Sequence, residues 1–187
     1  KMVLDPSEAT SPFRPHPGRM NLAPGLTAVA LAAEVAVPSP EVCGYLLIAA
    51  GAAFLDRVAE AFIGRAFFRA EVLALAGASA LAGAGLLLVG AARLGAAFPE
   101  TAAWHLALMG GLGLGVLGVF SIAGLRHTGR PLGLGVAVRL SLVCAAAAAL
   151  FRVLPDLGIL PPPPGPPYAV PAILWAMAYL IWLRIYW

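Results

Sequence analysis

Charged residues are scarce in this chain of 187 residues, since Asp, Glu, Lys and Arg make up only 11% of it. Soluble globular domains carry about 25%. Hydrophobic residues account for 61%, and the mean hydropathy is +0.90. They lie in long blocks instead of at helical or strand periods, which is typical of lipid-facing helices. The composition therefore excludes a soluble enzyme and a disordered tail and predicts a membrane protein with the lipid bilayer as its main partner.

Cysteine and basic runs are also scarce. Cys43 and Cys144 are the only cysteines; one opens a hydrophobic segment and the other lies deep in a different one, so we expect no structural disulfide. The net charge of +3 comes from 12 bases and 9 acids, with no long Lys/Arg run to bind phosphates, so nucleic-acid binding is not expected. A Ser/His/Asp arrangement, a phosphate-binding glycine loop followed by Lys, and paired carboxylates on one helix are absent, which argues against a hydrolase or a nucleotide-driven pump.

The apolar segments define the fold class. A hydrocarbon core of about 30 Å needs roughly 20 helical residues. Four segments reach that length, namely 72–92, 102–125, 134–154 and 168–186. Two earlier segments, 22–37 and 42–55, are shorter and are either thin spans or a re-entrant hairpin. The sequence predicts an all-α polytopic membrane bundle of about six transmembrane helices, in which the two N-terminal helices are short. Residues 1–20 form a proline-rich tail without a signal peptide, and 21–187 form one transmembrane domain.

The basic residues predict the orientation of this bundle. With six alternating helices and a cytoplasmic tail, ten bases fall on the inner side and two on the outer side, as the positive-inside rule requires. Both termini are then cytoplasmic. The inner bases are Lys1, Arg14, Arg19, Arg57, Arg65, Arg69, Arg126, Arg130, Arg139 and Arg184, and the outer ones are Arg93 and Arg152.

The segment 102–125 is rich in glycine on its surface. Gly111 and Gly115 have the small-xxx-small spacing that lets another helix backbone approach closely. Tight helix packing is one interpretation of this face. The other is that a flat macrocycle needs the same absence of bulk, so that a haem lies against Gly111 and Gly115.

Two histidines stand at the two ends of this segment. His105 and His127 are 22 residues apart, about 33 Å along a continuous helix, so they cannot both ligate one metal or one haem. The two histidines therefore mark either two sites or one site and one structural histidine. His105 shares a helix face with Met109, and this pair offers imidazole and thioether ligands to copper. The structural interpretation is that His105 is hydrogen-bonded to a partner in the helix. His127 and Arg130 lie in a basic turn, which either only obeys the positive-inside rule or holds a haem propionate or small anion.

Two further side chains are candidates. Glu34 is the one acid well inside a predicted span, where a carboxylate normally has a partner. An ion pair with Arg93 or Arg152 is the structural interpretation, and a proton relay the functional one. His16, between two prolines of the tail, is predicted on the same side as His127, so that a shared inner site is allowed.

The residues from Ala103-Trp104-His105 to His127-Thr128-Gly129-Arg130-Pro131 resemble the signature of the NnrS family. The last helix, with Trp175-Ala176-Met177-Ala178-Tyr179 and Arg184-Ile185-Tyr186, is similar to the family's C-terminal run. The family consists of bacterial polytopic membrane proteins described as haem- and copper-containing and linked to nitric-oxide metabolism. The resemblance is close from about residue 70 onward and loose before it.

This resemblance implies a protein of the bacterial inner membrane that binds haem b, with copper as a further possibility. His105 and His127 are the leading ligands, and Met109, Arg130, Gly111 and Gly115 complete the implied site. Family members have about twice as many helices, so the chain resembles their C-terminal half. Ligands from the missing half would then come from a homo-oligomer or a second membrane subunit. The alternatives are a cofactor-free structural subunit of a larger complex and a transporter half with Glu34 on the substrate path.

The predicted orientation has a direct test. A single cysteine introduced within 126–131 should be labelled from the cytoplasmic face, and one near Pro163 from the outer face. Labelling of the Pro163 position only from the cytoplasmic face would contradict the assignment.

Overall fold

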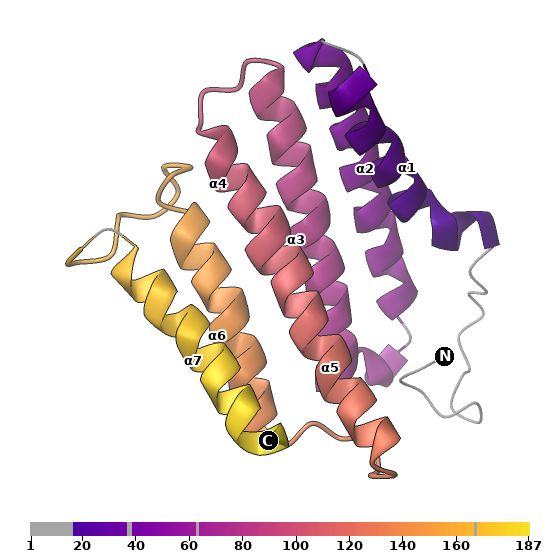
Figure 1. Ribbon diagram of the computed structural model, residues 1–187, viewed down its shortest axis with the longest axis vertical. Coiled ribbons are helices and arrows are strands. Elements are labelled where there is room, and N and C mark those ends of the chain that lie inside the picture. The colour runs from indigo at the N-terminus through magenta and orange to yellow at the C-terminus, as the bar shows by residue number, and fades with distance from the viewer. Residues whose placement is uncertain (1–16, 37–38, 63, 167) are drawn as a thin grey trace.

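The computed structural model describes residues 17–36, 39–62, 64–166 and 168–187, and most of them are helical. No strand occurs in these ranges, so the predicted all-α membrane bundle is confirmed (Figure 1). Five of its helical spans are long and apolar enough to cross a membrane. The helices are α1 (Pro17–Ala36), α2 (Pro40–Val58), α3 (Ala70–Arg93), α4 (Glu100–His105), α5 (Leu114–His127), α6 (Val136–Val153) and α7 (Ala169–Tyr186). A π-helical segment, η4 (Leu106–Gly113), joins α4 to α5, so that Glu100–His127 is one span of 28 residues.

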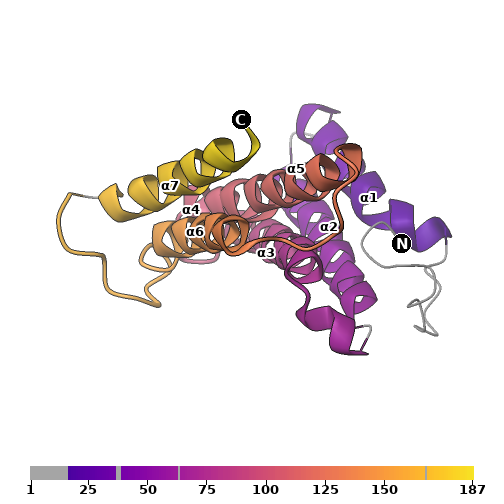
Figure 2. The same ribbon diagram turned by 90° about the horizontal axis from the view of Figure 1, so that it is seen from below.

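Successive helices are neighbours in space. α1 packs on α2, α2 on α3, α3 on the α4–η4–α5 span, and this span on α6, which carries α7. Figure 2, a view from below, shows α3 between the α1/α2 pair and the α6/α7 pair. The bundle therefore has two central spans, α3 and α4–η4–α5, with the α1/α2 pair on the outer side of α3 and the α6/α7 pair on the outer side of the other span.

The N-terminal pair differs from the prediction. α2 is not short: it runs from Pro40 to Val58 and, with a following 3-10 turn, forms a span of 22 residues. Asp56 and Arg57, which end the apolar run in the sequence, lie in its last turns. At its start, Ser39 accepts a hydrogen bond from the Val42 amide, as an N-cap does. Hydropathy alone placed the start two residues too late and the end three residues too early, because a helix continues past its apolar residues at the membrane surface.

α1 also begins earlier than predicted. It starts at Pro17, inside the segment expected to be a proline-rich tail, and Pro24 lies within the helix. Its apolar part, Met20–Ala36, remains shorter than the other spans. The short first helix is thus confirmed, whereas the short second helix is wrong. The rest of the tail, including His16, lies outside the described residues.

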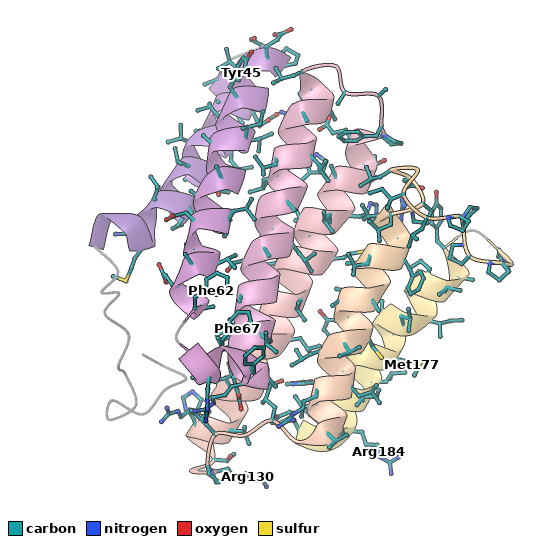
Figure 3. The ribbon with its side chains drawn as sticks, turned by 180° about the vertical axis from the view of Figure 1, so that it is seen from behind. Tyr45, Phe62, Phe67, Arg130, Met177 and Arg184 are labelled. Atoms are coloured by element: carbon teal, nitrogen blue, oxygen red, sulfur yellow. The ribbon has the colours of Figure 1, made fainter. Side chains whose placement is uncertain are left out.

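The amphipathic stretch after α2 forms two 3-10 turns, η2 (Ala59–Ala61) and η3 (Gly64–Phe68). Phe62 stacks on Phe67, which packs edge-on against Phe68 (Figure 3). Phe62 and Phe68 are largely exposed at the lower end of α2 and α3.

α3 packs against its neighbours with almost no side chain between the backbones. A Cβ added at Gly90 would lie 2.5 Å from the Gly44 carbonyl oxygen, and one at Gly51 would lie 2.6 Å from that of Gly83. On the other side of α3, a Cβ at Gly85 would lie 2.3 Å from the Ala107 nitrogen. Small residues permit such backbone contact, which is how membrane helices associate.

The glycine face of the α4–η4–α5 span packs within this chain. A Cβ at Gly111 would lie 2.6 Å from the Ala82 Cα of α3, and one at Gly113 would lie 2.2 Å from the Trp175 ring of α7. Gly115 is less crowded, since its Cβ would make an ordinary 3.5 Å contact with Ala78. The face therefore contacts other helices of this chain, which agrees with the first of the two interpretations of its glycines.

Aromatic side chains attach α7 to α5. Trp182 Nε1 donates to Ser121 Oγ at 3.1 Å, and the Tyr186 hydroxyl donates to the Ser121 carbonyl at 3.1 Å. Higher up, the Tyr179 hydroxyl donates to the Gly113 carbonyl at 3.4 Å. Tyr186 is thus partly buried against α5, while Trp187 is fully exposed.

Gly111 and Gly115 should respond differently to alanine. Gly111→Ala puts a methyl group against the α3 backbone, which no side-chain rotation relieves, and should cost about 1–3 kcal/mol. Gly115→Ala should change stability by less than about 1 kcal/mol, because its methyl group meets only an ordinary contact and alanine favours helix. Unfolding of the purified variants in detergent measures both values, and equal losses would contradict this packing.

Candidate functional site

His105 ends α4 and has one ring nitrogen engaged. Its Nδ1 lies 2.6 Å from the Thr101 carbonyl oxygen, one turn earlier in the helix. A carbonyl oxygen only accepts, so Nδ1 carries the proton and the lone pair is on Nε2. This is the arrangement that metal-ligating histidines adopt, with the second nitrogen donating to a backbone carbonyl.

The His105 imidazole lies on the outward side of its helix. Thr101, Leu108 and Leu112 of the same side are exposed, and His105 and Met109 are half-buried. The π-helical segment begins at Leu106, directly after the histidine. Single π-turns occur frequently at functional sites, and this one widens the helix where the polar side chain stands.

The glycine face and the histidine face are different faces. The space in front of Gly111 is filled by Ala82, and that in front of Gly113 by Trp175. A planar ligand held by His105 would therefore lie along the outward face of Leu108 and Leu112. The assignment of Gly111, Gly115 and Met109 to cofactor binding stays a prediction.

An ionic network joins three helices at the same end of the bundle as His105. Arg93, at the end of α3, pairs with Glu34 of α1 and, at 3.0 Å, with Glu100 of α4. The Trp104 indole also donates to Glu100, at 2.9 Å. The predicted ion pair of Glu34 is confirmed, and its partner is Arg93. Glu100 and Trp104 were missed, because nothing in the sequence shows that the α3–α4 turn folds Glu100 back onto Arg93.

The other conspicuous arginine at this end is Arg152. It pairs with Asp156 and its guanidinium lies 4.1 Å from the centre of the Tyr168 ring. Tyr168 is the one non-glycine residue with positive φ in the described part of the chain, at 66°. These contacts join the end of α6 to the start of α7 across the proline-rich connection.

The His-Thr-Gly-Arg-Pro string is, in its backbone, a helix terminator. Gly129 has φ +67°, and the Arg130 amide donates to the Leu125 carbonyl at 2.9 Å while the Gly129 amide donates to that of Arg126 at 3.2 Å. These two bonds form a Schellman motif, and Pro131 follows where the helix cannot continue. The helix end thus explains why glycine and proline occur in this string. It does not explain the side chains of His127 and Arg130.

His127 and Arg130 are exposed at the end of the bundle opposite His105. The predicted separation of the two histidines is confirmed, since they lie at the two ends of one continuous span. Among the described residues, no three His, Cys, Asp or Glu side chains gather as a metal site would require.

The connection that follows this turn is held by buried side chains. Glu71 of α3, which is 3% exposed, accepts from the Leu134 amide at 2.9 Å. Arg139 donates to the Leu134 carbonyl at 2.7 Å. Glu71 was missed because it stands just before the apolar run that defined the span. The sequence did contain one signal for Glu71, namely an acidic residue at the edge of a membrane segment.

These observations define the class of the protein as a polytopic helical membrane protein with single histidines at the two ends of one span. A model described as "NnrS protein" matches residues 2–187, and the chain belongs to the NnrS family. The match includes the first 70 residues, where the resemblance was expected to be loose. Neither a curated protein nor a solved structure matches.

The Arg93 network should matter more for stability than its individual acids. Arg93→Met leaves two carboxylates without their cation and should cost about 1–3 kcal/mol. Glu34→Gln, which keeps a polar partner for the guanidinium, should cost less than about 1 kcal/mol. Glu41→Gln, at an exposed side chain of the same end, serves as control and should stay within about 0.5 kcal/mol. Thermal unfolding measures these losses. A larger loss of stability in Glu34→Gln than in Arg93→Met would contradict the network.

Proposed function

We propose that this NnrS-family protein is a b-type haem-binding subunit of the bacterial inner membrane, linked to nitric-oxide metabolism, in which His105 ligates the iron. The single observation that carries the proposal is the hydrogen bond from His105 Nδ1 to the Thr101 carbonyl, which leaves the Nε2 lone pair for a ligand. Family membership supports the same assignment. Bound haem would supply an iron centre for diatomic ligands or electron transfer.

The surroundings of His105 fit a macrocycle. Leu108 and Leu112 provide an exposed apolar wall on the same side of the helix. Arg93 and Arg152 lie at this end of the bundle, but both are already paired with acids. The propionates would therefore extend towards water or towards a partner chain instead of replacing these ion pairs.

The other candidate ligands from the sequence, Met109 and His127, would not complete a haem site together with His105. Met109 lies on the same side as His105, and His127 is at the opposite end of the span. Two axial ligands must approach from opposite faces of the ring. We propose that a second copy of the chain or a second membrane subunit covers this face.

We also propose that the arginine-rich end of the bundle and both termini lie in the cytoplasm, as the charge distribution favours.

A cofactor-free structural subunit is the second candidate. The observation that favours it is the glycine face, which other helices of the same chain already occupy. The transporter alternative has less support, because the Glu34 carboxylate is engaged by Arg93.

The test is the haem content of three proteins purified from the membrane: the wild type, His105→Ala and His127→Ala. His105→Ala should lose most of the Soret absorbance and the pyridine-haemochrome signal, and added imidazole should restore part of both. His127→Ala is the matched control and should keep both, because it lies at the far end of the span.

Three results would decide otherwise. Loss in His127→Ala alone would move the ligand to the other end, and partial loss in both variants would indicate two haems. A wild-type protein that is purified with its natural partners and contains no haem would favour the cofactor-free structural subunit.

A further inference from the structure

A shallow cavity of about 200 Å³ lies at the arginine-rich end of the bundle, where three helices end. Its walls come from α5, the 128–135 connection, α6 and α7. They include Leu125, Val138, Ile185, Tyr186, Gly135 and Arg130. Figure 3 shows Arg130 at this end of the bundle, below α5.

The cavity has one cationic side chain and otherwise apolar walls. Val138 is 4% exposed and Leu125 is half-buried, whereas Ile185 opens towards the outside of the bundle. The Tyr186 hydroxyl already donates to the Ser121 carbonyl, so the ring contributes a wall and not a donor. An occupant must therefore be apolar on one side and anionic on the other.

Arg130 has no acidic partner among the residues that the structure describes. The nearest element with an acid, the start of α3, offers only Glu71, and that carboxylate accepts from the Leu134 amide and pairs with Arg69. The described part of this end contains seven arginines (Arg57, Arg65, Arg69, Arg126, Arg130, Arg139, Arg184) and three acids (Asp56, Glu60, Glu71). The surface is thus complementary to a negative charge.

The depth of the cavity agrees with a lipid headgroup. α5 ends at His127, α6 begins at Val136 and α7 ends at Tyr186, so the cavity lies where three apolar spans reach the membrane surface. Basic pockets between transmembrane helices bind the headgroups of anionic lipids.

We propose that this cavity binds one anionic phospholipid, with its phosphate at Arg130 and its glycerol and first methylenes against Leu125, Val138 and Ile185. The acyl chains then follow the outer surface of α6 and α7. The site is independent of the haem proposed at His105, which belongs to the other end of the bundle.

The experiment is native mass spectrometry of the full chain in nonionic detergent, titrated with phosphatidylglycerol or with phosphatidylcholine of the same acyl chains. One phosphatidylglycerol should be retained in preference to phosphatidylcholine. Arg130→Gln should weaken its binding about fivefold, as expected for one interfacial arginine. Arg184→Gln removes an exposed arginine of the same end that does not line the cavity, and should leave binding unchanged.

Two further arms separate a lipid from a free anion. Ala137→Trp fills the cavity from an exposed position without changing the charge, and should also reduce phosphatidylglycerol binding. Millimolar inorganic phosphate or glycerol 3-phosphate should not displace the lipid, because neither has an apolar part. Helical circular dichroism confirms that each variant is folded.

Four results would overturn the proposal. Equal losses in Arg130→Gln and Arg184→Gln would indicate diffuse charge attraction, and equal retention of the two lipids would remove the anionic preference. Displacement by inorganic phosphate would assign the cavity to a small anion, and unchanged binding in Ala137→Trp would place the lipid elsewhere. Haem content, measured on the Arg184→Gln and Ala137→Trp samples, should equal that of the wild type, because neither residue belongs to the haem site proposed at His105.

Discussion

The backbone of α3 lies in direct contact with helices on both sides, and the arrangement of the bundle depends on this contact. In lipid, apolar side chains gain little by leaving the hydrocarbon, so helices associate through close van der Waals packing. Gly83 and Gly90 admit α2 on one side, and Gly85 admits the α4–η4–α5 span on the other. Any side chain at these positions would separate the helices, so the rotation of each helix about its axis is fixed by its glycines.

The rotation of the α4–η4–α5 span also decides which way His105 faces. Because Gly111 faces α3 and Gly113 faces Trp175, the remaining side of the span, with His105, Leu108 and Leu112, is left facing outward. The histidine is therefore presented to the bundle's surroundings instead of its interior. Packing and ligand binding use different sides of one helix and do not compete for the same glycines.

The sequence predicted what depends on composition and local pattern. Long apolar runs predicted the membrane spans. The free-energy cost of an isolated carboxylate in a membrane predicted that Glu34 has a cationic partner. It did not predict what depends on three-dimensional approach, such as the heptad-spaced pairs Gly44/Gly51 and Gly83/Gly90 that meet across α2 and α3. Glu71 was missed for the same reason, since its partner is a backbone amide 63 residues away.

The Glu34–Arg93 ion pair has a consequence for biosynthesis. The two residues are 59 positions apart, on α1 and α3, and α1 is synthesised before α3. Until α3 is made, the Glu34 carboxylate lacks its Arg93 partner, and a charged group near the hydrocarbon is costly. α1 is also the helix with the shortest apolar part. Its stable insertion therefore depends on a helix synthesised later, so the N-terminal end of the bundle is completed only after its middle exists.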